Sequence, residues 1–253
     1  MKGLTILLFC CISVFGFCQN NQRFEEANAL YNDGKYAEAI DKYESILDSD
    51  QHSTELYFNL GNANYKLNNI APSIYYFEKA LLLSPNDKDI KNNLAFAQNM
   101  TIDAIETVPE VGFSRIFKNI INTFNTDTWA KIAIGGVLCF VILFLLYHFS
   151  YNTSRKRLAF ITSVLSLLIA CFSVAMAFQK DRLNKNDNPA IIFAQESRVK
   201  ANPNQTSEEV FRLHEGTKVQ VLETFNDWKK IQLSDQATGW IPSNDLKMLK
   251  LFL

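Results

Sequence analysis

Histidines and paired carboxylates are the residues of this 253-residue chain that could bind metals or act as general acids and bases. The chain has three histidines, His52, His148 and His214, and no two of them have metal-ligand spacing. The pairs Glu25-Glu26 and Glu208-Glu209 resemble solvated charge on a helix or loop. The sequence contains no phosphate-cradling glycine loop and no nucleophile elbow. We therefore expect no catalytic residue, no metal site and no cofactor, and we predict that the protein is not an enzyme.

The cysteines and the overall charge argue against several further kinds of site. The cysteines are Cys10, Cys11, Cys18, Cys139 and Cys171. All five lie in apolar runs, so we expect neither disulfides nor cysteine-based metal sites. Cys139 and Cys171 fit best as small apolar residues inside membrane helices. The net charge of -1 and the isoelectric point near 6.3 give no sign of a nucleic-acid partner.

Polar and aromatic residues that recur about 34 residues apart are better candidates for binding than for catalysis. The recurring residues are Phe24, Asn28, Ala29, Tyr31, Ile40, Glu44 and Leu47, which are matched by Phe58, Asn62, Ala63, Tyr65, Ile74, Glu78 and Leu81. A period of about 34 residues is that of the tetratricopeptide helix-turn-helix repeat. Repeats of this kind bind partner proteins and carry out no chemistry of their own.

Residues 22–99 resemble the tetratricopeptide family at its usual landmark positions. These are Ala27, Leu30, Gly34, Tyr36, Ala39, Tyr43 and Ile46 in the first unit, and Tyr57, Leu60, Gly61, Tyr65, Phe77, Ala80 and Pro85 in the second. Gln51 and Asn68 depart from the pattern, because a proline and a glycine are usual at those positions. A further helix at about Lys88–Asn99 fits the capping helix that stacked repeats need. We predict two repeats and a capping helix.

In the tetratricopeptide family the first helices of successive units line a concave groove, which makes a partner-binding groove the first candidate site. The same register predicts that the groove is lined by Phe24, Asn28, Tyr31, Phe58, Asn62, Tyr65, Lys66, Asn92 and Phe96. A ladder of amides could hydrogen-bond an extended peptide, and aromatic rings could hold its side chains. The alternative is that the aromatic residues belong only to the core.

The start of the chain has the composition of a secretory signal peptide over residues 1–18. Its apolar core, Gly3 through Phe17, is too short to span a bilayer, and a polar segment follows at Gln19. Cleavage after Cys18 is the favoured interpretation. Lipidation of Cys18 is the alternative, and it is weakened by Phe17, because that processing needs a small residue just before the cysteine.

The middle of the chain predicts membrane association. Apolar residues recur on one face of an amphipathic helix over 109–130, which we place in the membrane interface with Trp129 as an aromatic anchor. The alternative for this segment is a soluble helix packed on the repeats. Residues 131–149 and 158–178 are long apolar runs that predict two transmembrane helices, and 179–189 is expected to be a linker.

The loop at 150–157 contains Arg155-Lys156-Arg157 and no acidic residue, which favours a cytoplasmic location. An exported N-terminus followed by two spans would then place both soluble parts in the periplasm.

Residues 190–250 resemble the bacterial SH3-like family, which implies a small all-β barrel. The blocks that carry the resemblance are Ser197–Pro203, Leu213–Val219, Trp228–Ile231 and Gly239–Pro242. Strands are expected at Ile191–Phe193, Lys218–Leu222 and Lys229–Leu233, separated by turn residues. Trp228 and Trp240 are candidates for a ligand surface. The alternative is that both tryptophans are structural.

The order of these parts predicts a multi-domain membrane protein with α-helical tetratricopeptide repeats, a two-helix transmembrane hairpin and an SH3-like barrel. This order resembles the BatE family of the Bacteroidetes aerotolerance operon, and the resemblance covers nearly the whole chain. That family is encoded beside a MoxR-type AAA ATPase and von Willebrand A-domain membrane proteins. The resemblance implies an accessory scaffold of an inner-membrane complex.

Three functional hypotheses follow from the sequence. The first is a scaffold whose groove binds a periplasmic segment of a membrane partner. The second is a cell-envelope tether whose SH3-like domain binds peptidoglycan. The third is a catalytic subunit, and the lack of a catalytic constellation in the sequence argues against it.

Overall fold

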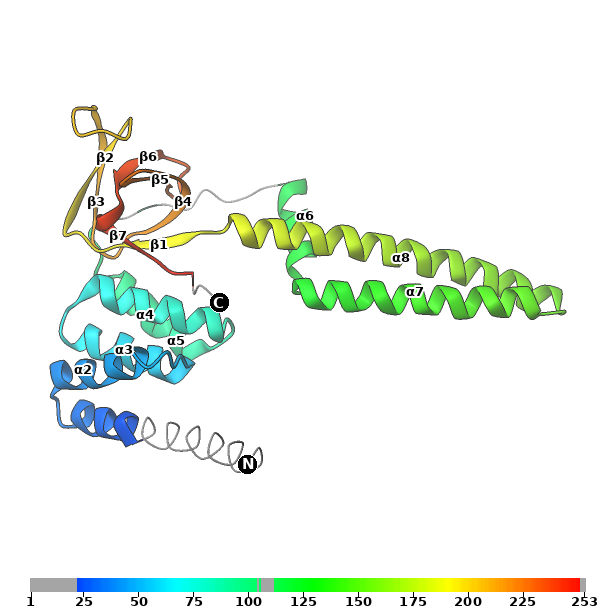
Figure 1. Ribbon diagram of the computed structural model, residues 1–253, viewed down its shortest axis with the longest axis horizontal. Helices are drawn as coiled ribbons and strands as arrows, with labels where there is room; N and C mark the ends of the chain where they lie inside the picture. Colours follow the sequence, from blue (N-terminus) through cyan, green and yellow to red (C-terminus); the bar gives the residue numbers. More distant parts are fainter. Residues whose placement is uncertain (1–21, 104, 106–111, 251–253) are drawn as a thin grey trace, which may run out of the picture. The chain divides into compact units, whose positions relative to one another are not determined.

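The computed structural model describes residues 22–103, 105 and 112–250 of the chain (Figure 1). The signal peptide expected at 1–18 and the first residues of the segment expected at 109–130 lie outside these described residues. The chain divides into two compact units. One comprises Met1–Thr107 together with Asn188–Leu253, and the other comprises Val108–Asp187.

The N-terminal part of the first unit consists of paired antiparallel helices, as the repeat predicted. A first helix over residues 22–32 is followed by α2 (Tyr36–Leu47), α3 (Thr54–Lys66), α4 (Ile70–Leu83) and α5 (Lys88–Gln98). Gly34 and Asn68 occupy the same turn of the two repeats and have positive φ angles of 79° and 60°. Asparagine tolerates this left-handed conformation better than most residues, which explains why Asn68 can stand where the family has glycine.

Small residues let the helices of a pair approach closely. A Cβ atom on Gly61 would lie 2.6 Å from the Phe77 ring, so only glycine fits at this crossing of α3 and α4. Ser73 Oγ donates a hydrogen bond to the Gly61 carbonyl at 2.9 Å. The side chains of Ser53 and Asp87 accept hydrogen bonds at the N-termini of α3 and α5 and thereby define where these helices begin.

The C-terminal part of the first unit is an antiparallel sheet of seven strands in the order β3-β2-β6-β5-β4-β1-β7. The strands are β1 (Pro189–Ile192), β2 (Glu196–Lys200), β3 (Glu209–His214), β4 (Lys218–Phe225), β5 (Trp228–Gln232), β6 (Thr238–Pro242) and β7 (Leu246–Met248). The strands expected from the sequence therefore form β1, β4 and β5. Val199, Ile231 and Ile241 are fully buried in the core of this sheet.

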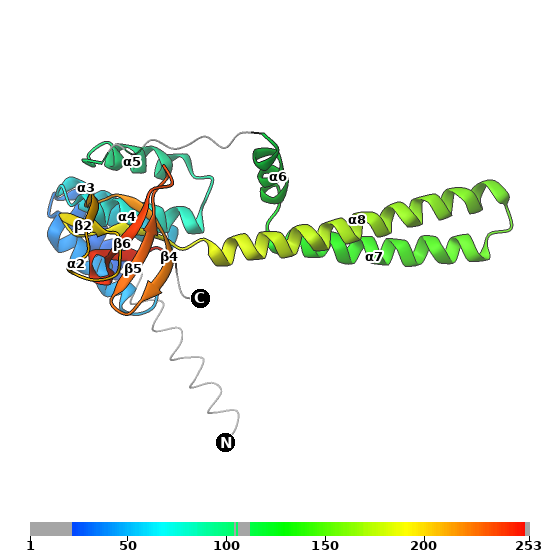
Figure 2. The same cartoon turned by 90° about the horizontal axis from the view of Figure 1, so that it is seen from above.

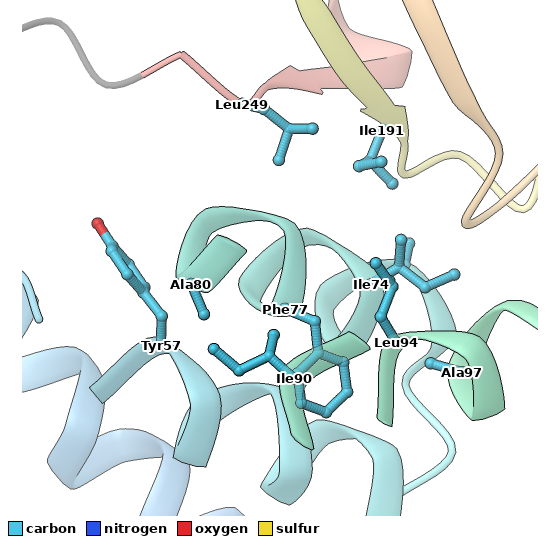
Figure 3. Packing of buried hydrophobic residues seen from close by; sticks show 10 residues of the cluster. Tyr57, Ile74, Phe77, Ala80, Ile90, Leu94, Ala97, Ile191 and Leu249 are labelled. Carbon is cyan, nitrogen blue, oxygen red and sulfur yellow. The ribbon is translucent and has the colours of Figure 1, made fainter. Parts of the chain in front are cut away.

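The helices and the sheet share one hydrophobic cluster. Ile191 of β1 and Leu249, which follows β7, are buried together with Ile74 and Phe77 of the repeats (Figure 3). Side chains of a strand alternate between its two faces, so Ala190 and Ile192 enter the core of the sheet while Ile191 points the other way into the helical cluster. Because β1 buries both of its faces, the repeats and the sheet pack into one compact unit.

The second unit contains α6 (Phe113–Asn122), α7 (Thr126–Phe149) and α8 (Thr153–Asn186), and α7 and α8 run side by side (Figures 1 and 2). Both α7 and α8 are long and apolar enough to cross a membrane. They are in close contact at Gly136, where an added Cβ would lie 3.0 Å from the Ala170 Cβ. Ser166 Oγ donates a hydrogen bond to the Gly136 carbonyl at 2.7 Å, which ties the two helices together.

The helix boundaries in the second unit differ from those expected. The segment 109–130 is divided, because the Asn125 side chain accepts a hydrogen bond from the Thr128 backbone N–H at 2.8 Å and starts α7 there. The basic segment 150–157 is helical from Thr153 onward, since Asn152 caps α8. The expected linker 179–189 is also helical as far as Asn186, and a 2.6 Å ion pair between Lys185 and Asp181 spans one turn there.

Candidate binding surfaces

The recurring asparagines link the first helices of successive units. Asn59 Nδ2 donates a hydrogen bond to Asn28 Oδ1 at 3.0 Å, and Asn93 Nδ2 donates to Asn62 Oδ1 at 3.3 Å. Asn28 Oδ1 also accepts a 2.6 Å hydrogen bond from the Tyr43 hydroxyl. The amide oxygens of the predicted ladder thus hold the helices together.

Four of the aromatic residues of the predicted groove are half-buried. The Phe24 ring packs against Tyr43 at 5.7 Å between centroids, and the Phe58 ring packs against Phe77 at 5.9 Å. Tyr31 and Tyr65 are partly buried against the two helical clusters. These four side chains therefore contribute to the core, and their contact with a partner stays a prediction.

Three of the predicted groove residues project into solvent. Lys66 at the end of α3 and Asn92 on α5 are exposed, and Phe96 on α5 is 58% exposed. An exposed phenylalanine beside polar side chains is a favourable contact for an apolar side chain of a partner. The exposed part of the predicted groove therefore lies at its C-terminal end.

Three tyrosine hydroxyls, those of Tyr43, Tyr57 and Tyr76, form hydrogen bonds within the repeats. Burial raises the pKa of Tyr43 and that of Tyr57 to about 12. Burial, together with the negative charge of Glu44, raises the pKa of Tyr76 well above its ordinary value. The Tyr76 hydroxyl donates a 2.9 Å hydrogen bond to Glu44. All three phenols are therefore neutral at physiological pH and act as hydrogen-bond donors or acceptors, not as acids.

Asp103 connects the helical part to the sheet, and sequence reasoning missed it. Its carboxylate accepts hydrogen bonds from the Thr217 hydroxyl at 2.6 Å and from the backbone N–H of His214 at 2.7 Å, and it lies 2.7 Å from His214 Nδ1. Burial alone would raise the pKa of Asp103, but the hydrogen bonds from Thr217 and His214 outweigh it, so the net pKa is lowered. Asp103 and His214 lie far apart in the sequence, and no local signal pairs them.

Two further contacts belong to the same junction. Lys218 Nζ lies 2.8 Å from Glu78 Oε2, and the Glu78 side chain is only 10% exposed. Gly216 has a φ angle of 86°, and a Cβ there would lie 2.8 Å from Thr101 Cγ2. Glycine is required at this position because the backbone of the sheet approaches the helical part so closely.

The two tryptophans of the sheet share its outer face. Lys230 pairs with Trp240 and Trp228 pairs with Pro242 across β5 and β6, and residues directly opposite each other in a sheet point to the same side. Trp228 and Lys230 are two residues apart and share one face, whereas Ile231, which follows Lys230, is buried and faces the other way, into the core. Trp228 and Trp240 are both partly buried, so each residue keeps some exposed surface.

A partly exposed aromatic patch surrounds the two tryptophans. The Phe225 ring contacts the Trp240 ring edge-on at 6.5 Å, and Lys230 Nζ lies 5.9 Å from the centre of the Trp240 ring. Phe225 is paired with Trp228 across β4 and β5. The predicted ligand surface is therefore a continuous strip, although its binding role stays a prediction.

A metal site finds no support within the described ranges. No group of three or more His, Cys, Asp or Glu side chains that could hold a metal ion occurs among residues 22–103, 105 and 112–250.

Two family comparisons agree with this architecture. The bacterial SH3 domain family matches residues 196–247, which include β2 to β6, and the tetratricopeptide repeat family matches residues 54–87, which form α3 and α4. No curated protein matches the chain. The first helix pair and β1 lie outside both matches, yet they complete the helical stack and the sheet. The chain thus carries a tetratricopeptide repeat and a C-terminal bacterial SH3 domain.

Proposed function

We propose that the protein is a non-enzymatic scaffold or adaptor of a bacterial inner-membrane complex, which binds partner proteins through its repeats and its SH3 domain. The observation that carries this proposal is the shared hydrophobic cluster of the two binding modules. Ile191 and Leu249 are buried against Ile74 and Phe77, so the repeats and the sheet present their surfaces as one body. A fixed arrangement of two binding surfaces suits a protein that positions partners relative to each other.

The same cluster supports a two-pass topology. Residues that share a buried core lie on the same side of a membrane, and the two apolar helices α7 and α8 lie between them in the sequence. An even number of spans satisfies this requirement, because the chain leaves and returns on one side. With a signal peptide at 1–18, that side is the periplasm, and Arg155-Lys156-Arg157 at the turn of the hairpin face the cytoplasm.

The resemblance to the BatE family suggests which proteins the scaffold holds. We propose von Willebrand A-domain membrane proteins and a MoxR-type AAA ATPase system as partners, with a role in aerotolerance or envelope stress. These partners come from family resemblance, whereas the protein-binding role itself is supported by the two matched domain types.

Crosslinking and mass spectrometry of the tagged protein in its native membrane test the scaffold. Because Asn28 and Asn62 hold the helices together, exposed groove residues are better targets, and we choose Lys66→Ala together with Phe96→Ser. Asp41→Asn on the exposed side of α2 is the matched control. The scaffold predicts that membrane partners are crosslinked to the wild type and to the control but are lost from the double variant. Partners that persist at full yield would place binding outside the groove.

A peptidoglycan-binding tether is the second candidate, and the aromatic strip at Trp228 and Trp240 favours it. Aromatic side chains on an exposed sheet face suit the apolar faces of sugar rings or peptide stems. The test is sedimentation of the purified full-length protein with peptidoglycan, since removal of the SH3 domain from the repeats would expose Ile191. The tether predicts co-sedimentation that Trp240→Ala abolishes, and a protein that stays in the supernatant contradicts it.

A further inference from the structure

The tip of the hairpin contains a groove that neither binding module explains. It has a volume of about 730 Å³ and lies between the C-terminal end of α7 and the N-terminal end of α8. Its lining residues are Leu143, Leu146, Phe149, Ser150, Arg155, Leu158, Ala159 and Thr162. The walls are mainly apolar, and Arg155 is the only charged residue among them.

The packing of α7 and α8 explains why the groove opens at the tip. Gly136, Ser166 and Ala170 bring the two helices into close contact in the middle of the hairpin. Toward the tip, the Tyr147 and Phe160 rings meet at 5.4 Å on one side, whereas the small side chain of Ala159 lines the groove. The groove lies along the side where Leu146 and Leu158 remain exposed.

The charge at the tip is of one sign. Arg155, Lys156 and Arg157 are consecutive, and the sequence from Phe149 to Thr162 contains no Asp or Glu. The nearest acidic residues on the two helices, Asp127 and Asp181, belong to the opposite end of the hairpin. Within the part of the chain that the structure describes, the Arg155 guanidinium has no ion-pair partner.

We propose that this groove binds one anionic phospholipid, with the lipid phosphate on the Arg155 guanidinium and an acyl chain along Leu143, Leu146 and Leu158. This proposal rests on the membrane-spanning hairpin of the proposed function. The charge selects an anion, because guanidinium groups pair well with phosphate oxygens. The apolar walls select a lipid over a free phosphate ion, since an acyl chain packs along leucine side chains whereas a phosphate ion makes no favourable contact with them.

The other side of the tip offers an internal comparison. A smaller groove of about 260 Å³ is lined by Tyr147, Thr153, Lys156, Arg157 and Phe160. Lys156 Nζ lies 5.2 Å from the centre of the Tyr147 ring, so its charge already rests on an aromatic face. Arg155 and Arg157 are thus two arginines of the same tip that line different grooves. General attraction to anionic membranes would affect them equally, whereas a specific lipid site would not.

The experiment is native mass spectrometry of the full-length protein in detergent, titrated with phosphatidylglycerol or with phosphatidylcholine. Arg155→Gln removes the proposed phosphate contact, and Ala159→Leu fills the groove without changing the charge. The matched controls are Arg157→Gln at the same tip and Arg182→Gln near the other end of α8. Extraction of the membranes with alkaline carbonate is carried out first, and a protein that is released there would refute the spanning hairpin itself.

If the protein stays in the membranes during carbonate extraction, we expect it to bind one phosphatidylglycerol molecule about fivefold more tightly than phosphatidylcholine. We expect Arg155→Gln and Ala159→Leu to abolish this preference, and both controls to keep it. Equal losses in Arg155→Gln and Arg157→Gln would overturn the proposal in favour of general electrostatic attraction. Unchanged binding in Ala159→Leu, or displacement of the lipid by excess inorganic phosphate, would also overturn it, because the site would then recognise only an anion.

Discussion

Replacement of Asp103 by alanine should loosen the junction between the repeats and the SH3 domain. The carboxylate accepts hydrogen bonds from the Thr217 hydroxyl and the His214 backbone, lies 2.7 Å from the His214 ring, and is only 12% exposed. Each hydrogen bond to a charged group contributes about 1.5–3 kcal/mol, and contributions within one network do not add fully. We therefore expect Asp103→Ala to lower the free energy of unfolding of this unit by about 3 kcal/mol.

The stability should also depend on pH in a defined direction. Because the folded-state pKa of Asp103 is lowered from 3.8, its contribution is fully present above the unfolded-state pKa and is lost as the pH falls through the folded-state value. Asp103→Asn keeps an acceptor but removes the charge, so it should be milder than Asp103→Ala at neutral pH. It should also remove part of the loss of stability on acidification.

Urea unfolding of the full-length protein in detergent measures the free energy of unfolding and its dependence on pH. Hydrogen exchange at the backbone amides of β1 and α4 then reports whether the junction has loosened. Asp41→Asn, an exposed aspartate on α2, is the control and should change the stability by less than about 0.5 kcal/mol. The reasoning is refuted if Asp103→Ala behaves like Asp41→Asn. It is also refuted if β1 and α4 keep their full protection in Asp103→Ala, since the carboxylate would then not join the two parts.

Three further substitutions test other contacts. Gly216→Ala should destabilise the first unit by about 2 kcal/mol, because φ is 86° there and the new Cβ would lie 2.8 Å from Thr101 Cγ2. A midpoint of thermal unfolding equal to that of the wild type would contradict this expectation. Gly136→Leu should force α7 and α8 apart, since even an added Cβ at this position would lie 3.0 Å from the Ala170 Cβ. The yield of cysteine crosslinks between the two helices measures this separation, and an unchanged yield would disprove the close packing. Trp129→Phe removes the 3.1 Å hydrogen bond from the indole N–H to the Ile121 carbonyl. The backbone amides of α6 should then exchange their hydrogens faster. Unchanged exchange would show that apolar packing alone holds α6 in place.

Features that depend on nearby residues could be predicted from the sequence. The 34-residue recurrence predicted the helix pairs. Each helix and each turn depends on residues that are close together in the sequence, so these elements could be recognised from local patterns. The apolar runs of α7 and α8 were equally visible, since their length and composition suffice. The four SH3-like blocks predicted the C-terminal sheet domain, which the family comparison supports for residues 196–247.

Helix ends and groove orientation were less accessible to sequence reasoning. The ends of α7 and α8 depend on the capping side chains of Asn125 and Asn152, which could equally have stood in a loop. Asn28 and Asn62 were correctly placed on equivalent helices, but only the packing of those helices shows that their oxygens face Asn59 and Asn93.

The junction of the repeats and the sheet was decided by the tertiary structure alone. Ile191 looks like any strand residue in the sequence, and its burial against Ile74 depends on how β1 meets α4. Asp103 and His214 are brought together only when the chain between them has left the first unit and returned to it. Pairing of this kind has no local signal, because a hydrogen bond depends on distance and direction in space and not on separation along the chain.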